Sequence, residues 1–349
     1  MAVLGTESTT SIDQKQVKSR PFIALLVFTG GLVLLALGMG ISISVGAADI
    51  SLTTVWNALF HFQPDMTSHL IVRDLRIPRV LGAAIAGDFL AISGAVMQGM
   101  TRNPLAAPSI IGIVDGATFA IAMAFVFFPD TSYSGLLLAS FLGSALSVIL
   151  VYAIGSASRG GLTPVKLALA GVTVGALFRA ISMILALHFN VGRDITFWFA
   201  GGVSGLKWED LDFLFPIAIA CIPASLILSR SITILSLGQD VAVGLGQRTV
   251  VTQLIGTILV LFMTGAAVSV AGAISFIGLV VPHITRFIVG MDYRYVIPCS
   301  MVLGAALVVY ADILSRVMNP PSITPVGAIT ALLGVPFFIY LVRKEGRAL

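Results

Sequence analysis

Long apolar runs with almost no charged residues recur along this chain of 349 residues and limit what it can fold into. The first run extends from Phe22 to Val45, which is long enough to cross the ~30 Å hydrocarbon core of a bilayer as one helix. Charged residues make up only 10% of the chain, whereas a soluble domain carries about 25%. We therefore expect an all-α polytopic membrane protein, with lipid as the solvent for much of its surface.

The apolar runs predict about ten transmembrane helices in one domain. The first run is longer than the apolar core of a signal peptide, so we expect it to be retained as a span. Short polar loops leave no room for a soluble domain, which predicts a single transmembrane domain over residues 22–342 between short tails at 1–21 and 343–349. The expected spans are about 22–45, 80–100, 107–128, 135–157, 165–189, 211–229, 250–271, 274–290, 297–317 and 323–342.

Loop charges predict the orientation of these spans. Lys and Arg are roughly twice as frequent in the loops on the side of the termini as in the loops on the other side, which predicts cytoplasmic termini. The apolar stretch Ser51–Phe62 is too short to cross the bilayer. We expect it to form a helix on the outer surface, with Trp56 at the membrane interface.

Three arginines before the second span, Arg73, Arg76 and Arg79, depart from the positive-inside pattern. They have two interpretations from sequence alone. One is a collar that reaches lipid headgroups. The other is a docking patch for an acidic partner outside the cell, because guanidinium groups bind carboxylates with two hydrogen bonds. Arg316, at the outer end of the ninth expected span, could join such a patch.

Polar residues and prolines interrupt the apolar sequence between Gly87 and Ser109. Backbone groups that proline leaves unpaired at membrane depth must be buried in protein or line a water-filled route. The segment therefore predicts either part of a translocation path or a plain re-entrant turn. The residues concerned are Ser93, Gly94, Gln98, Arg102, Asn103, Pro104 and Pro108.

The longest cytoplasmic segment, residues 231–249, mixes small and aliphatic residues. It has two interpretations, an ordinary connecting loop or a short surface helix that offers aliphatic side chains to a cytoplasmic partner.

Three ionisable residues, Asp88, Asp115 and Arg179, fall inside predicted spans. A charge at the bilayer centre costs about 2.5–3.5 kcal/mol on insertion scales, so each must face protein or water. We expect structural ion pairs or positions near the end of a span, with a proton or ion relay as the alternative.

Several sequence signals of chemistry are missing. The chain has no Gly-x-x-x-x-Gly-Lys-[Ser/Thr] motif to cradle a nucleotide phosphate. The four histidines and two cysteines are scattered without metal-ligand or catalytic spacing. We therefore expect a non-catalytic chain with no metal and no cofactor of its own.

Many short segments, in order along residues 22–342, resemble the iron-complex and cobalamin (FecCD-type) permeases of ABC importers. The resemblance includes Arg76-Ile77-Pro78-Arg79, Arg102-Asn103-Pro104-Leu105, Phe197-Trp198-Phe199-Ala200-Gly201-Gly202, the run from Ala271 to Arg286 with Pro282-His283, Asp312 with Arg316, and Pro325-Val326-Gly327.

The resemblance implies a type II ABC importer permease with ten helices per subunit, two such subunits around a central pathway, two cytoplasmic ATPase subunits that bind ATP and Mg, and an extracytoplasmic binding protein. It implies that glutamates of the binding protein bind Arg76, Arg79 and Arg316. It also implies a coupling segment that contacts the ATPase, at Leu237, Gly238, Gln239, Asp240, Leu245 and Gly246, and a cytoplasmic gate at Asn103, Pro104 and Leu105 and at Thr163 and Pro164. The family often has small hydroxyl residues where this chain has Thr163-Pro164-Val165.

The expected function is translocation of an iron–siderophore chelate across the bacterial cytoplasmic membrane by alternating access. The alternatives are a haem or cobalamin permease of the same family, or an ion-coupled secondary transporter. An intramembrane enzyme is the remaining rival. Whether the permease pairs with itself or with a different permease chain stays open.

Overall fold

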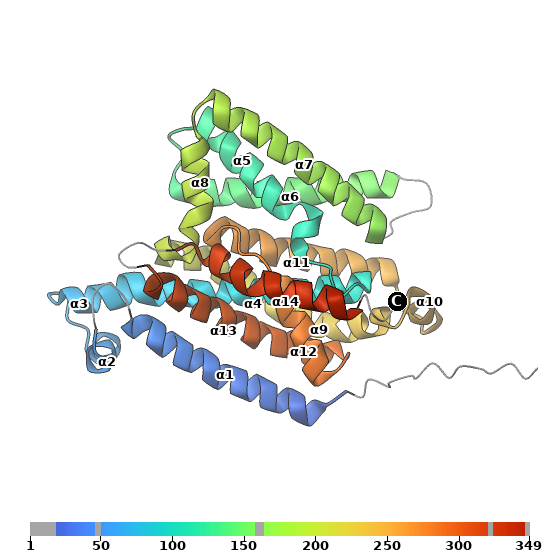
Figure 1. Cartoon of the computed structure of the whole chain (residues 1–349), viewed down its shortest axis with the longest axis horizontal. Helices are drawn as coiled ribbons and strands as arrows, with labels where there is room; N and C mark the ends of the chain where they lie inside the picture. Colours follow the sequence, from blue (N-terminus) through green and yellow to red (C-terminus); the bar gives the residue numbers. More distant parts are fainter. Residues whose placement is uncertain (1–18, 46–49, 158–163, 320–323, 346–349) are drawn as a thin grey trace, which may run out of the picture.

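The structure is a computed structural model that describes residues 19–45, 50–157, 164–319 and 324–345 (Figure 1). These residues are helical almost throughout, as the apolar runs predicted. The helices are α1 (Pro21–Ser44), α2 (Leu52–Phe60), α3 (Thr67–Leu70), α4 (Ile77–Thr101), α5 (Ile113–Phe127), α6 (Tyr133–Ala157), α7 (Pro164–His188), α8 (Gly192–Gly201), α9 (Trp208–Ser236), α10 (Gln239–Gly244), α11 (Thr249–Ala271), α12 (Ile277–Val289), α13 (Tyr293–Val317) and α14 (Val326–Glu345).

Seven of the described helices are long and apolar enough to cross a membrane. Three shorter apolar helices, α5, α12 and the Val326–Ile339 part of α14, occupy the remaining predicted spans. The prediction of about ten membrane helices is therefore confirmed. Even the span expected near 274–290, which contains Pro282, forms a helix at Ile277–Val289.

Helix α4 lies at the centre of the bundle and packs against α9, α11, α12 and α13. Helices α5, α6 and α7 form a second group that contacts the first through α11 (Figure 1). Glycine makes the closest approaches possible. A Cβ on Gly94 would overlap the carbonyl of Gly278 in α12, and one on Gly87 would overlap the carbonyl of Gly304 in α13. Close backbone contact through glycine is a common way for membrane helices to associate.

Two helix starts differ from the sequence-based expectation. The second span was expected to begin after Pro78, but the helix is continuous from Thr67 to Thr101. Proline is tolerated in the first turn of α4, and the wider π-helical turn at Ile71–Arg76 accommodates the carbonyls that its ring leaves unpaired. The third span was expected from about residue 107, but α5 begins only at Ile113, because Gly112 adopts a positive φ of 72°.

Different short helices lie at the two ends of the bundle. The helix predicted for Ser51–Phe62 is present as α2, with Trp56 exposed and the Ser51 hydroxyl accepting a hydrogen bond from the Thr54 amide. Figure 1 shows α2, α3 and α8 at one end of the bundle and α10 at the other, the end where α1 begins and α14 finishes. We refer to these as the outer and inner ends.

Candidate functional site

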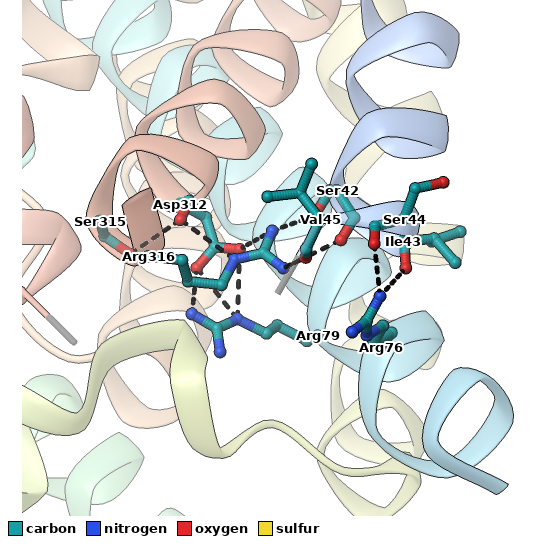
Figure 2. A network of polar contacts seen from close by, with 9 residues as sticks. All are labelled: Ser42, Ile43, Ser44, Val45, Arg76, Arg79, Asp312, Ser315 and Arg316. Carbon is teal, nitrogen blue, oxygen red and sulfur yellow. Dashed lines mark hydrogen bonds and ion pairs between the residues drawn. The ribbon is translucent and has the colours of Figure 1, made fainter. Parts of the chain in front are cut away.

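At the outer end, the carboxylate of Asp312 is the centre of a buried polar network (Figure 2). Arg79 donates from Nη2 to Oδ1 at 2.7 Å and from Nε to both oxygens at 3.1 and 3.2 Å. Arg316 lies one turn after Asp312 on α13 and pairs with Oδ2 at 3.0 Å. The Asp312 side chain is 0% exposed, and the two arginine side chains are 11% and 9% exposed. One carboxylate therefore binds two guanidinium groups from different helices and balances only one of their two charges.

Arg316, together with Arg76, also holds the end of α1. Arg316 Nη1 donates to the carbonyls of Ser42 and Val45 at 2.9 and 2.7 Å, and Arg76 donates to the carbonyls of Ile43 and Ser44. The last carbonyls of a helix lack partners within the helix and carry the negative end of its dipole. Because α1 has no basic residue in its last turn, the π-helical turn before α4 and helix α13 supply the cations that cap it.

The three arginines predicted to dock a binding protein thus lie together, but they are mostly buried and bind the protein's own oxygens. A collar reaching lipid headgroups is therefore wrong for Arg76 and Arg79. Three arginines and one aspartate leave the network with a net positive charge. Sequence reasoning missed that Asp312 binds Arg79, although the four-residue spacing of Asp312 and Arg316 was a signal of a helical ion pair.

Near the inner end, Gln98 joins α4 to α12. Its amide nitrogen donates to the carbonyls of Gly278 and Leu279 at 3.2 and 3.1 Å. Pro282 has no N–H to pair with the Gly278 carbonyl four residues before it, so the Gln98 side chain supplies the missing donor. Gln98 is 1% exposed and in this conformation contacts α12 rather than an open path.

The other predicted gate residues follow the end of α4. Arg102 ends the helix with a positive φ of 53°, and the Asn103 side chain accepts a hydrogen bond from the Leu105 amide at 2.9 Å, which closes a tight turn around Pro104. Pro164 begins α7. Thr163 lies outside the described residues.

The segment at 231–249 contains a surface helix rather than a plain loop. Helix α10 is flanked by Gly238 and Gly246, with φ of 132° and 78°, values that suit glycine. Gln247 fixes the segment by donating to the Ser231 carbonyl and the Thr252 hydroxyl. The aliphatic side chains Leu237, Val241, Val243 and Leu245 are exposed around α10, next to Gln239 and Asp240. An exposed aliphatic cluster at the end of a membrane bundle is typical of an interaction surface.

The intramembrane charges take different positions. Asp115 of α5 and Arg179 of α7 form an ion pair with 2.6 Å between Oδ2 and Nη1. Asp88 of α4 is buried, and its Oδ1 makes no hydrogen bond within the described residues. The expected ion pair is therefore confirmed for Asp115 and Arg179 but not for Asp88.

Sequence comparison identifies the relatives of this bundle. Residues 33–344 match the FecCD transport family. The chain belongs to the FecCD transport family. It is 55% identical over 340 residues to the iron(3+)-hydroxamate import system permease protein FhuB of Bacillus subtilis. The alignment covers 97% of this chain and 88% of that protein. It is also 39% identical to the cobalamin import system permease protein BtuC of Halobacterium salinarum, covering 86% of this chain and 80% of that one.

The fold agrees with this membership. A solved structure described as an inward-facing conformation of a metal-chelate type ABC transporter superposes with a TM-score of 0.81 at 29% identity, covering 92% of this chain and 99% of the other. The FecCD chain is therefore a multi-pass, non-catalytic permease subunit with the type II ABC importer fold. Such a permease works with separate ATPase subunits and a substrate-binding protein, and binds no cofactor itself.

Proposed function

We propose that this FecCD permease carries ferric hydroxamate siderophores across the bacterial cytoplasmic membrane. The observation that carries the proposal is the 55% identity to an iron(3+)-hydroxamate permease over 97% of the chain, compared with 39% to a cobalamin permease. Residues 22–342 form the permease domain, with short cytoplasmic tails on either side. Two permease subunits, identical or different, enclose the pathway, and two ATPase subunits that bind ATP and Mg drive it.

The outer network supports docking of a binding protein. Arg76, Arg79 and Arg316 carry a positive excess over Asp312 at the outer end, which attracts carboxylates of a partner. Nη1 of Arg79 makes no hydrogen bond within the described residues while Nε and Nη2 hold Asp312. The guanidinium can thus bind an incoming carboxylate without releasing its own.

The inner end supports coupling to the ATPase. Val241 of α10 and the flanking Leu237 and Leu245 are exposed, and α9 and α11 hold α10 against the bundle. A groove on an ATPase subunit can bury these side chains and move α9 and α11 when ATP closes the ATPase pair. The turn at Asn103–Leu105 and the start of α7 at Pro164 would open or close the cytoplasmic gate in response.

Transport in proteoliposomes tests the proposal. The permease, its ATPase and its binding protein are reconstituted together. Radioactive iron is supplied either as a neutral ferric trihydroxamate or as ferric citrate, and its uptake is measured with and without cobalamin as a competitor. The expected result is ATP-dependent uptake of the trihydroxamate that excess cobalamin does not reduce. Competition by cobalamin would move the chain to the cobalamin permeases. Equal uptake without ATP would favour an ion-coupled secondary transporter.

A further inference from the structure

The Asp115–Arg179 pair lies near the middle of the span formed by α7, far from either end of the helix, yet the side chains are exposed. Arg179 is nine residues before the end of α7 at His188, which places it about 14 Å along the helix from that end. Its side chain is 57% exposed and that of Asp115 is 18% exposed. Within the described parts of the membrane-spanning helices, no other exposed charged side chain lies more than two turns from a helix end.

The pair is fixed at this depth and does not reach toward the headgroups. Asp115 is in the first turn of α5, and Gly112 just before it lies against Gly171 and Gly175 of α7. The hydroxyls of Ser144 and Ser147 on α6 bind the carbonyls of Ile113 and Ile111, so the start of α5 is anchored inside the bundle. An arginine bonded to this point cannot extend to the membrane surface as a lone snorkelling side chain does.

The carboxylate of Asp115 lies directly against the backbone of α7 at Gly175. A Cβ on Gly175 would overlap Oδ2 of Asp115, so the glycine leaves room for the carboxylate to lie against α7. Arg179 uses only Nη1 for this carboxylate, and its Nε and Nη2 make no hydrogen bond within the described part of the chain. Asp115 therefore orients the guanidinium and leaves donors pointing outward.

The apolar neighbours on this face of α7, such as Val172 and Met183, are compatible with lipid, but an exposed guanidinium in the hydrocarbon region is not. Charged side chains at this depth face water-filled cavities or protein and mark substrate pathways. A ferric chelate built from hydroxamate or carboxylate groups presents a shell of oxygen acceptors. Free N–H donors of an arginine bind such oxygens well.

We propose that Arg179, positioned by Asp115, lines the translocation pathway and binds the oxygen shell of the ferric chelate as it crosses. This inference rests on the proposed function, because it takes the chelate from there. It adds a substrate-binding residue to the middle of the membrane, away from the docking network and the coupling helix. Gly175 is a positioning residue in this site.

Transport kinetics test the inference. In the reconstituted importer, Arg179→Gln is expected to raise the KM for a neutral ferric trihydroxamate about tenfold, the size of one lost charged hydrogen bond, with maximal rate within about twofold of wild type. Arg179→Lys should recover part of the affinity. The matched control is Arg294→Gln, since Arg294 also pairs with an aspartate at 2.6 Å and is also 57% exposed, but lies in the first turn of α13 at the inner end. The control should leave KM unchanged.

The outcomes separate this inference from the proposed function. If the wild-type importer does not transport the chelate, the proposed function fails. If wild type transports and Arg179→Gln keeps the wild-type KM, the inference alone is overturned. If the variants fail to assemble, the inference is tested on the wild-type importer by chemical modification. Modification of Arg179 by the polar reagent p-hydroxyphenylglyoxal, read by peptide mass spectrometry, must be slowed by the ferric trihydroxamate, and an equal rate with and without the chelate overturns the inference.

Discussion

Asp312 at the outer end and Asp115 inside the membrane both bind an arginine at close range, 2.7 and 2.6 Å, but their surroundings are opposite. Asp312 is fully buried and holds two guanidinium groups, and one of them, that of Arg316, also caps α1. Asp115 holds one guanidinium that remains more than half exposed. The carboxylate of Asp312 stabilises the structure, because the two arginines beside it are mostly buried and have little water to solvate their charges. An exposed pair in the middle of a span contributes little stability and has donors available for a ligand.

The largest effect is expected from Asp312→Asn. The substitution keeps the shape of the side chain but leaves Arg79 and Arg316 buried without a counter-charge, which costs about 3–5 kcal/mol of unfolding free energy. Thermal unfolding of the purified permease in nanodiscs should show a large fall in the midpoint. Asp292→Asn is the control, because its partner Arg294 is exposed. Equal stability of Asp312→Asn and wild type would show that the network does not hold the outer end together.

An intermediate effect is expected from Arg76→Gln. The change removes charged hydrogen bonds to the Ile43 and Ser44 carbonyls and costs about 1.5–3 kcal/mol, while the Asp312 pairs remain. Under the docking proposal, the affinity of the binding protein should also fall, measured by surface plasmon resonance against the permease in nanodiscs. Arg193→Gln, at an exposed arginine of α8 at the same end of the bundle, is the control for general loss of charge. Unchanged affinity for Arg76→Gln would remove Arg76 from the docking surface.

The smallest effect on stability is expected from Asp115→Asn. The remaining Arg179 is exposed, and exposed pairs contribute less than about 1 kcal/mol. The same nanodisc unfolding assay should therefore give a midpoint close to that of wild type, and Gly175→Ala, which displaces the carboxylate, should behave similarly. A loss as large as that of Asp312→Asn would mean that Arg179 is enclosed in an apolar environment.

The sequence predicted the helices well because a transmembrane span is a local property. About twenty apolar residues suffice to define one, whatever they pack against. The errors fall where local chemistry competes with the apolar pattern. Helix α4 continues through Pro78 because a π-helical turn precedes it, and α5 begins late because of the backbone conformation of Gly112.

The site was predicted only in part, because pairing across the chain is not local. The sequence drew attention to Arg76, Arg79 and Arg316, but not to their burial, which depends on where α1 ends. It singled out Asp115 and Arg179 without showing that they bind each other across 64 residues. Gln98 bonds a carbonyl that Pro282, 184 positions later, leaves without a donor. The sequence does not show this contact, because it depends on the packing of α4 against α12.

The contrast between the two arginine environments is tested most directly by chemical modification of the wild-type importer in proteoliposomes without chelate. p-Hydroxyphenylglyoxal reacts with arginines that water reaches, and peptide mass spectrometry measures each site separately. We expect rapid modification of Arg179 and slow modification of Arg79 and Arg316. Protection of Arg179 to the level of Arg79 and Arg316 would contradict the account, because it would mean that water does not reach the middle of the pathway beside α7.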